Sequence, residues 1–164
     1  KEWYKEGIYV GYRYFDTFGI KPAYEFGYGL SYTNFDINVK NVSVNEDKVT
    51  VKAEVTNTGK TYSGKEVVQV YFSAPDSKDA EKEYQQLAAY GKTDELAPGE
   101  SQVLTLTYDT DEMAYYSEEK ASYILDPGTY YVRVGDSSRN TKVAAAIKLN
   151  QSAVTEVLSN HFLI

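Results

Sequence analysis

The chain has 164 residues, the size of one domain or of one domain with appended segments. It has no cysteine, which excludes disulfides, cysteine-ligated zinc and thiol nucleophiles. The formal net charge of −7 at pH 7 argues against a nucleic-acid or anionic-membrane partner, and no apolar run reaches the ~20 residues of a membrane span.

The start of the chain has neither an initiator methionine nor the pattern of a signal peptide. Its first residue is lysine, and residues 1–20 contain no apolar signal-peptide core. We therefore expect the chain to begin within a longer protein. The absence of cysteine fits a cytoplasmic location, which the sequence slightly favours, and is compatible with a secreted one.

Aromatic residues concentrate in the first fifth of the chain. Of its 17 tyrosines, six phenylalanines and one tryptophan, eleven lie in residues 1–32. They are Trp3, Tyr4, Tyr9, Tyr12, Tyr14, Phe15, Phe18, Tyr24, Phe26, Tyr28 and Tyr32. A tyrosine or tryptophan ring is largely apolar and ends in a polar group, which suits a contact surface. We expect residues 1–33, the lead-in segment, to pack against a partner surface.

After the lead-in segment the apolar pattern becomes that of β-strands. Residues 35–44 form a first strand in which Val39 and Val42 break the alternation, and this break predicts a β-bulge. Residues 49–55 alternate between small apolar and polar side chains, as in a strand with one wet face. Residues 66–73 are apolar on both faces, which predicts a central strand.

Three further alternating stretches predict strands at 101–109, 128–135 and 142–149. Turn-forming residues separate the strands at 45–47, 57–60, 75–76, 97–99 and 126–128, and Gly59 is free to take a positive φ. Short strands divided by turns predict an all-β protein, an antiparallel two-sheet β-sandwich.

The remaining stretches do not have a strand pattern. Residues 76–86 are polar and charged, which predicts a long loop with a helical turn, and residues 110–120 predict a crossover between the two sheets. Apolar residues at 154, 157 and 158 have helical spacing and predict a short helix. The apolar end at 162–164 predicts docking or a further domain.

Six motifs follow one another in order. They are EGIYVGYRYFDT at 6–17, YEFGYGLSY at 24–32, NTG at 57–59, GKEVVQVYFSAP at 64–75, LAPGES at 96–101 and DPGTYYVRVGDSSR at 126–139. Over residues 6–149 this combination resembles family 3 glycoside hydrolases, the β-glucosidases and their relatives. The matching region is the junction of the second catalytic domain with the C-terminal fibronectin type III-like domain. The resemblance implies a junction segment at 1–33, a fibronectin type III-like sandwich at 34–149 and a tail or linker at 150–164.

Three positions depart from the family's pattern. Glu83-Tyr84 stand where a proline is usual, Ala88-Ala89-Tyr90 replace an aromatic turn, and Tyr123 replaces a tryptophan. These replacements are conservative in physical terms, so the implied fold stands.

The resemblance implies a parent enzyme that hydrolyses terminal β-glycosides by a retaining mechanism with two carboxylates. Neither the Ser-Asp-Trp nucleophile segment nor the general-acid segment occurs in this chain, so we expect no catalytic residue. The acidic groups at 76–83 and 109–112 lack the spacing of a calcium loop. His161 is the only histidine, and Gly27-Tyr28-Gly29 lacks the phosphate-binding pattern. We expect no metal and no cofactor.

The resemblance and the ring-rich lead-in segment together predict an interface with the catalytic domains of the parent. The candidate interface residues are Tyr12, Arg13, Tyr14, Phe26, Tyr28 and Tyr32. Arg13 can stack on rings or bridge a carboxylate such as Asp16, which we favour over contact with sugar. Substrate would then reach this chain only through the parent.

Two other functions compete with that of an accessory domain. Exposed tyrosines could serve a carbohydrate-binding module as stacking platforms, although most rings precede the sandwich. An adhesion-type fibronectin or immunoglobulin-like domain would act through protein contacts, and the absent disulfide and the ordered motifs argue against it.

Overall fold

The computed structural model describes residues 32–76, 85–117, 119–150 and 153–159, the last range as backbone. These residues form ten strands and one 3-10 turn. The elements are β1 (Phe35–Asn45), β2 (Lys48–Asn57), β3 (Val67–Ser73), β4 (Gln86–Lys92), β5 (Ser101–Asp109), η1 (Thr110–Met113), β6 (Tyr115–Ser117), β7 (Ser122–Ile124), β8 (Gly128–Ser137), β9 (Asn140–Asn150) and β10 (Ala153–Ser159). The predicted all-β class is confirmed.

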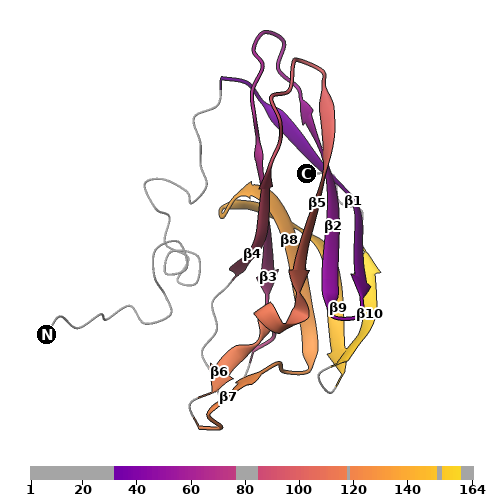
Figure 1. Cartoon of the computed structure of the whole chain (residues 1–164), viewed down its shortest axis with the longest axis vertical. Coiled ribbons are helices and arrows are strands. Elements are labelled where there is room, and N and C mark those ends of the chain that lie inside the picture. The colour runs from indigo at the N-terminus through magenta and orange to yellow at the C-terminus, as the bar shows by residue number, and fades with distance from the viewer. Residues whose placement is uncertain (1–31, 77–84, 118, 151–152, 160–164) are drawn as a thin grey trace, which may run out of the picture.

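The strands form two main sheets that face each other (Figure 1). One sheet has the order β1-β2-β5 and the other the order β10-β9-β8-β3-β4, with antiparallel pairing throughout. A small hairpin, β6–β7, lies at the lower end in Figure 1, and the loops after β2 and before β5 lie at the upper end.

The core lies between the sheets and follows the predicted alternation. Val49, Val51 and Val55 of β2 are fully buried, and Val68 and Val70 of β3 face them in the same core cluster. β3 is buried on nearly every residue because it lies between β8 and β4. The predictions of a half-buried strand at 49–55 and of a central strand at 66–73 are confirmed.

The predicted irregularity in the first strand is a β-bulge. The pairing of β1 with β2 shifts between Val39 and Asn41, so that Lys40 is the extra residue. The bulge resets the alternation, and both Val39 and Val42 point into the core.

The predicted helix around 154–158 is wrong. These residues belong to β10, which pairs with β9 through Val154 opposite Leu149 and Val157 opposite Ile147. The edge of β9 offers unpaired backbone groups, and the β-branched residues of the segment suit a strand. This tertiary pairing outweighs the helical spacing of three apolar residues.

Two other segments differ from expectation or refine it. Residues 88–90 are part of the edge strand β4, where the sequence suggested a turn. Residues 110–120 do connect the two sheets, because β5 belongs to one and β8 to the other, and η1 and the β6–β7 hairpin occupy the crossover. Of the predicted loop at 76–86, residues 77–84 lie outside the described ranges.

Candidate domain interface

One of the predicted interface residues, Tyr32, lies within the described residues; Tyr12, Arg13, Tyr14, Phe26 and Tyr28 lie outside them. Its side chain is 88% exposed, and its ring lies 6.4 Å from that of Tyr62, with an angle of 57° between the ring planes. Tyr62, in the loop after β2, is 58% exposed. Two accessible rings therefore meet where the lead-in segment joins the sandwich.

Beneath this ring pair, the fully buried Asn57 joins three segments. Its Oδ1 accepts hydrogen bonds from Thr33 Oγ1 (2.7 Å) and from the Gly59 backbone N–H (3.0 Å). Its Nδ2 donates to the backbone carbonyls of Tyr62 and Leu96, both at 2.9 Å. Both of the side chain's polar atoms are thus doubly bonded, which satisfies the amide completely.

Backbone contacts extend this joint, which we call the anchor (Thr33, Asn34, Asn57, Gly59, Tyr62 and Leu96). The Thr58 N–H donates to the Asn34 carbonyl at 2.8 Å. Gly59 is not among the positive-φ glycines of the described residues; it is needed because a Cβ there would overlap Thr33 Oγ1. The expectation of a positive φ is therefore wrong, and close packing is the reason for glycine.

Sequence reasoning missed the anchor because it treated residues 57–60 as a turn alone. The local part was readable, since an asparagine whose oxygen accepts from the second following N–H is an Asx-turn. The partners Thr33 and Leu96 are 24 and 39 residues away, so no local pattern indicates them.

A second exposed ring pair lies on the β6–β7 hairpin, at the opposite end of the sandwich (Figure 1). Tyr116 and Tyr123 are cross-strand partners, 53% and 77% exposed. Their ring centroids are 5.3 Å apart with an edge-to-face angle of 66°. In the turn between these strands Ala121 has a positive φ of 47°. The Lys120 N–H donates a hydrogen bond to Ser117 Oγ, which stabilises the turn. No pattern in the sequence indicates this pairing.

Side-chain hydrogen bonds also form on the outward face of the five-stranded sheet, the face that points away from the core. The hydroxyl of the fully buried Tyr71 donates to Gln69 Oε1. Gln85 Nε2 donates to the Ser138 carbonyl, and Thr141 Oγ1 donates to Gln85 Oε1 at 3.1 Å. These bonds tie the β8–β9 hairpin to the residue before β4.

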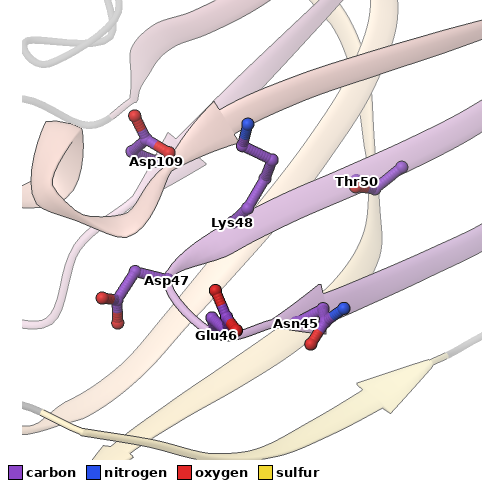
Figure 2. A pocket seen from close by; sticks show the side chains of 6 residues that line it. All are labelled: Asn45, Glu46, Asp47, Lys48, Thr50 and Asp109. Atoms are coloured by element: carbon purple, nitrogen blue, oxygen red, sulfur yellow. The ribbon is translucent and has the colours of Figure 1, made fainter.

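A shallow hollow of about 370 Å³ lies at the β1–β2 turn, lined by Asn45, Glu46, Asp47, Lys48, Thr50 and Asp109. Figure 2 shows that the carboxylates of Glu46, Asp47 and Asp109 stand apart and do not converge on one point. Among the described residues, no three His, Cys, Asp or Glu side chains are grouped to hold a metal ion. No helix in these ranges is long and apolar enough to span a membrane.

The titratable groups with shifted pKa values have structural causes. Burial raises the pKa of the Glu66 carboxyl; the Val67 N–H that donates to Oε1 (2.8 Å) opposes this, and the Asp136 carboxylate adds to it. Burial also raises the pKa of the Tyr130 hydroxyl, which donates to the Asp126 carbonyl at 2.8 Å, and of the Tyr108 hydroxyl. None of these groups is paired in a geometry for acid–base catalysis.

Residues 66–138 match the fibronectin type III-like domain family, and the described β-sandwich is a fibronectin type III-like domain. The chain is 40% identical over 136 residues to a β-glucosidase of Kluyveromyces marxianus, covering 82% of this chain and 16% of that protein. It also resembles the structure of β-glucosidase 3B from Thermotoga neapolitana in complex with α-D-glucose, with a TM-score of 0.81 and 42% identity over 96% of this chain and 21% of that one.

A third match is the GH3 β-glucosidase of Bifidobacterium adolescentis, with a TM-score of 0.75 and 36% identity over 94% of this chain and 21% of that one. The chain belongs with the fibronectin type III-like domains of family 3 β-glucosidases. It spans 16 to 22% of the length of the curated relatives that it matches first.

Proposed function

We propose that this chain is a non-catalytic accessory domain that supports the catalytic domains of a β-glucosidase-type glycoside hydrolase. The observation that carries the proposal is the coverage of the likeness. Nearly all of this chain, 96%, matches about a fifth, 21%, of a β-glucosidase, and its sequence contains neither segment of the family's catalytic pair.

The accessory role divides the chain into three parts. Residues 1–33 form the junction segment, residues 34–149 the sandwich, and residues 150–164 a tail that contributes β10, an edge strand of the five-stranded sheet. In the parent, the catalytic domains contact the junction segment through Tyr12, Arg13, Tyr14, Phe26, Tyr28 and Tyr32. The exposed Tyr32, next to the hydrogen-bonded anchor, supports this arrangement.

The chemistry belongs to the parent. It hydrolyses terminal β-glycosides with retention, using two carboxylates about 5–5.5 Å apart. The sandwich holds the catalytic domains in position. Each ring that the junction segment buries against them stabilises this arrangement by about 25 cal/mol per Å² of apolar surface buried. No metal or cofactor enters this scheme.

The test is an activity assay on the isolated chain with an aryl β-glucoside. We expect hydrolysis no faster than in buffer, because no carboxylate pair of the retaining type is present. A β-glucosidase that contains its own barrel domain is the positive control. Turnover at an enzyme-like rate by the purified chain would refute the proposal.

The Tyr116–Tyr123 pair is the observation that favours a second candidate, a carbohydrate-binding module. Rings inclined at 66° do not form one flat platform, so a pyranose could stack on Tyr123 alone. Titration with cello-oligosaccharides, followed by intrinsic fluorescence, separates the candidates. A saturable change that is lost in Tyr123→Ala would favour the module, and no change would favour the accessory domain.

A further inference from the structure

We propose that β5 pairs with β5 of a second copy of this chain, antiparallel and in a single register, so that the two three-stranded sheets become one continuous sheet. The inference concerns contact between copies of the chain, whereas the proposed function concerns contact with catalytic domains. It uses none of the interface residues assigned to that function, so the two proposals can fail separately.

The first support is the regularity of β5 as an edge strand. In the described ranges the edges of the two main sheets are β1, β5, β4 and β10. A register shift interrupts the pairing of β1, of β4 and of β10 with the neighbouring strand. β5 pairs with β2 along its whole length without a shift. Bulges protect sheet edges against the addition of a further strand, and β5 lacks this protection.

The sequence of β5 lacks the other common protections as well. Residues 101–108 contain no charged residue and no proline. By comparison, β1 carries Asp36 and Lys40, and β4 carries Lys92. Charged side chains and proline on an edge discourage pairing with another chain. β5 is therefore the edge that is best suited to accept a strand.

The backbone groups that point to the open edge of β5 belong to alternate residues. The Asn57 N–H donates to the Glu100 carbonyl at one end of the β2–β5 ladder, and the Thr110 N–H donates to the Asp47 carbonyl at the other. In an antiparallel ladder, residues bonded in this way alternate with residues whose N–H and C=O point away from the partner strand. Even-numbered residues of β5 therefore face β2. The residues whose backbone groups point to the open edge are Ser101, Val103, Thr105, Thr107 and Asp109.

The opposite sheet does not occupy this edge. β4 lies against the core-facing side of β5, where a Cβ on Gly91 would be 2.6 Å from Leu106 Cδ2. Among the described residues, no backbone hydrogen bond runs between β4 and β5. Leu104, on the same side of β5 as Leu106, is only partly buried. A second copy at this edge would cover more of its side chain.

Symmetry selects the register of the pair. Two identical strands pair about a two-fold axis, and β5 uses its full length if Thr105 lies opposite its own counterpart. Val103 then lies opposite Thr107 and Ser101 opposite Asp109, so no like charges meet. Each residue whose backbone groups point to the open edge donates one hydrogen bond and accepts one. Val103, which is 50% exposed, gains a β-branched cross-strand neighbour.

Sedimentation velocity of the 164-residue chain tests the proposal, and we expect a dimer that forms with increasing concentration. Thr105→Glu should weaken the dimer at least about tenfold, because two carboxylates then lie opposite each other at the two-fold axis. Within one copy the new carboxylate faces Lys52, the β2 partner of Thr105, so the fold tolerates the change. Ser43→Glu, on β1 at the other edge of the same sheet, adds the same charge and should leave the dimer unchanged.

Complementary charges test the register itself. An equimolar mixture of Thr105→Glu and Thr105→Lys should dimerise to within about threefold of wild type, because opposite charges then face each other across the axis. Each variant alone should remain a monomer under the same conditions. Circular dichroism melting curves report whether each variant is folded.

Three results would overturn the inference. The first is a wild-type chain that stays monomeric at every concentration. The second is an equally strong dimer in Thr105→Glu and wild type, which would place the association elsewhere, such as in the ring-rich lead-in segment. The third is a mixture of the two charge variants that associates no better than either alone. The proposed function stands in each case, because the activity assay tests it independently.

Discussion

Asn57 connects the lead-in segment to two loops that are distant in the sequence. Its amide is hydrogen-bonded to the Thr33 hydroxyl and to the backbone carbonyls of Tyr62 and Leu96. Removing the amide takes one hydrogen bond each from the Thr33 hydroxyl, the Gly59 N–H and the Tyr62 and Leu96 carbonyls, in a site that is buried or part-buried, although the Leu96 carbonyl keeps its bond from the Gly64 N–H. Unsatisfied buried groups of this kind cost about 1–3 kcal/mol each, with partial relief by relaxation.

We therefore expect Asn57→Ala to lower the free energy of unfolding by about 2–3 kcal/mol. Urea denaturation checks this as a lower midpoint with an unchanged slope. Asn41→Ala, on the exposed surface of β1, is the control and should change stability little. An equal loss in both variants would show that the Asn57 contacts contribute nothing specific.

Tyr108 and Tyr130 are both buried, and they differ in whether the hydroxyl group has a hydrogen-bond partner. The Tyr108 hydroxyl has no hydrogen-bond partner among the described residues, whereas that of Tyr130 donates to the Asp126 carbonyl, as in the tyrosine corner of β-sandwiches. We expect Tyr108→Phe to leave stability unchanged or raise it by up to about 1 kcal/mol, and Tyr130→Phe to lower it by about 1 kcal/mol. Thermal unfolding of the two variants is the measurement; the reverse order would contradict the structure.

Glu66 links stability to pH. Its pKa is raised in the folded state, so the folded protein holds this proton more tightly than the unfolded chain. The stability that protonated Glu66 contributes is fully present below its pKa in the unfolded chain. It is lost as the pH rises through its pKa in the folded protein. Glu66→Gln should therefore stabilise the protein at pH 7, by less than about 1 kcal/mol because the group is partly exposed, and not below pH 4. Melting temperatures of Glu66→Gln and of the exposed control Glu119→Gln across this range check it; parallel curves for the two variants would refute it.

At the scale of elements, the β8–β9 hairpin depends on the absence of a side chain at Gly135. A Cβ at this position would overlap the backbone carbonyl of Asn140 across the hairpin. We expect Gly135→Ala to lower the free energy of unfolding by about 2 kcal/mol or more, because backbone must move. Gly99→Ala is the comparison, since nothing lies within 4 Å of its Cβ position and only its φ of 81° is unfavourable. Urea midpoints should place Gly135→Ala clearly below it.

The elements that the sequence predicted are those with a marked apolar pattern, on both faces in β3 and on one face in most of the others. The alternation of residues 49–55 and 101–109 and the interruption between Val39 and Val42 are direct consequences of a core on one side of the strand. β4, β10 and the β6–β7 hairpin were missed, because their strands form by pairing with neighbours and not by a strong pattern of their own. The anchor was missed for a similar reason, since its partners come from three separate segments.

At the scale of the whole molecule, the lead-in segment and the sandwich should be separable. The sandwich core begins with residues of β1, and Thr33 keeps its bond to Asn57 when the preceding residues are removed. We expect deletion of residues 1–32 to leave a folded domain that is more soluble, because eleven aromatic residues are removed. Soluble concentration after centrifugation and a cooperative unfolding curve are the measurements. Loss of folding would mean that the lead-in segment belongs to the core.

If the parent enzyme holds the domain through the anchor, the stiffness of the anchor sets how far the opposite end of the domain can travel. A ten-residue strand such as β2 spans about 33 Å. If the joint at Asn57 yielded by about 10°, the tip of the β6–β7 hairpin would swing by about 6 Å, roughly the spacing of two neighbouring aromatic rings. A stiff pivot at one end is therefore what gives any surface at the other end a defined position.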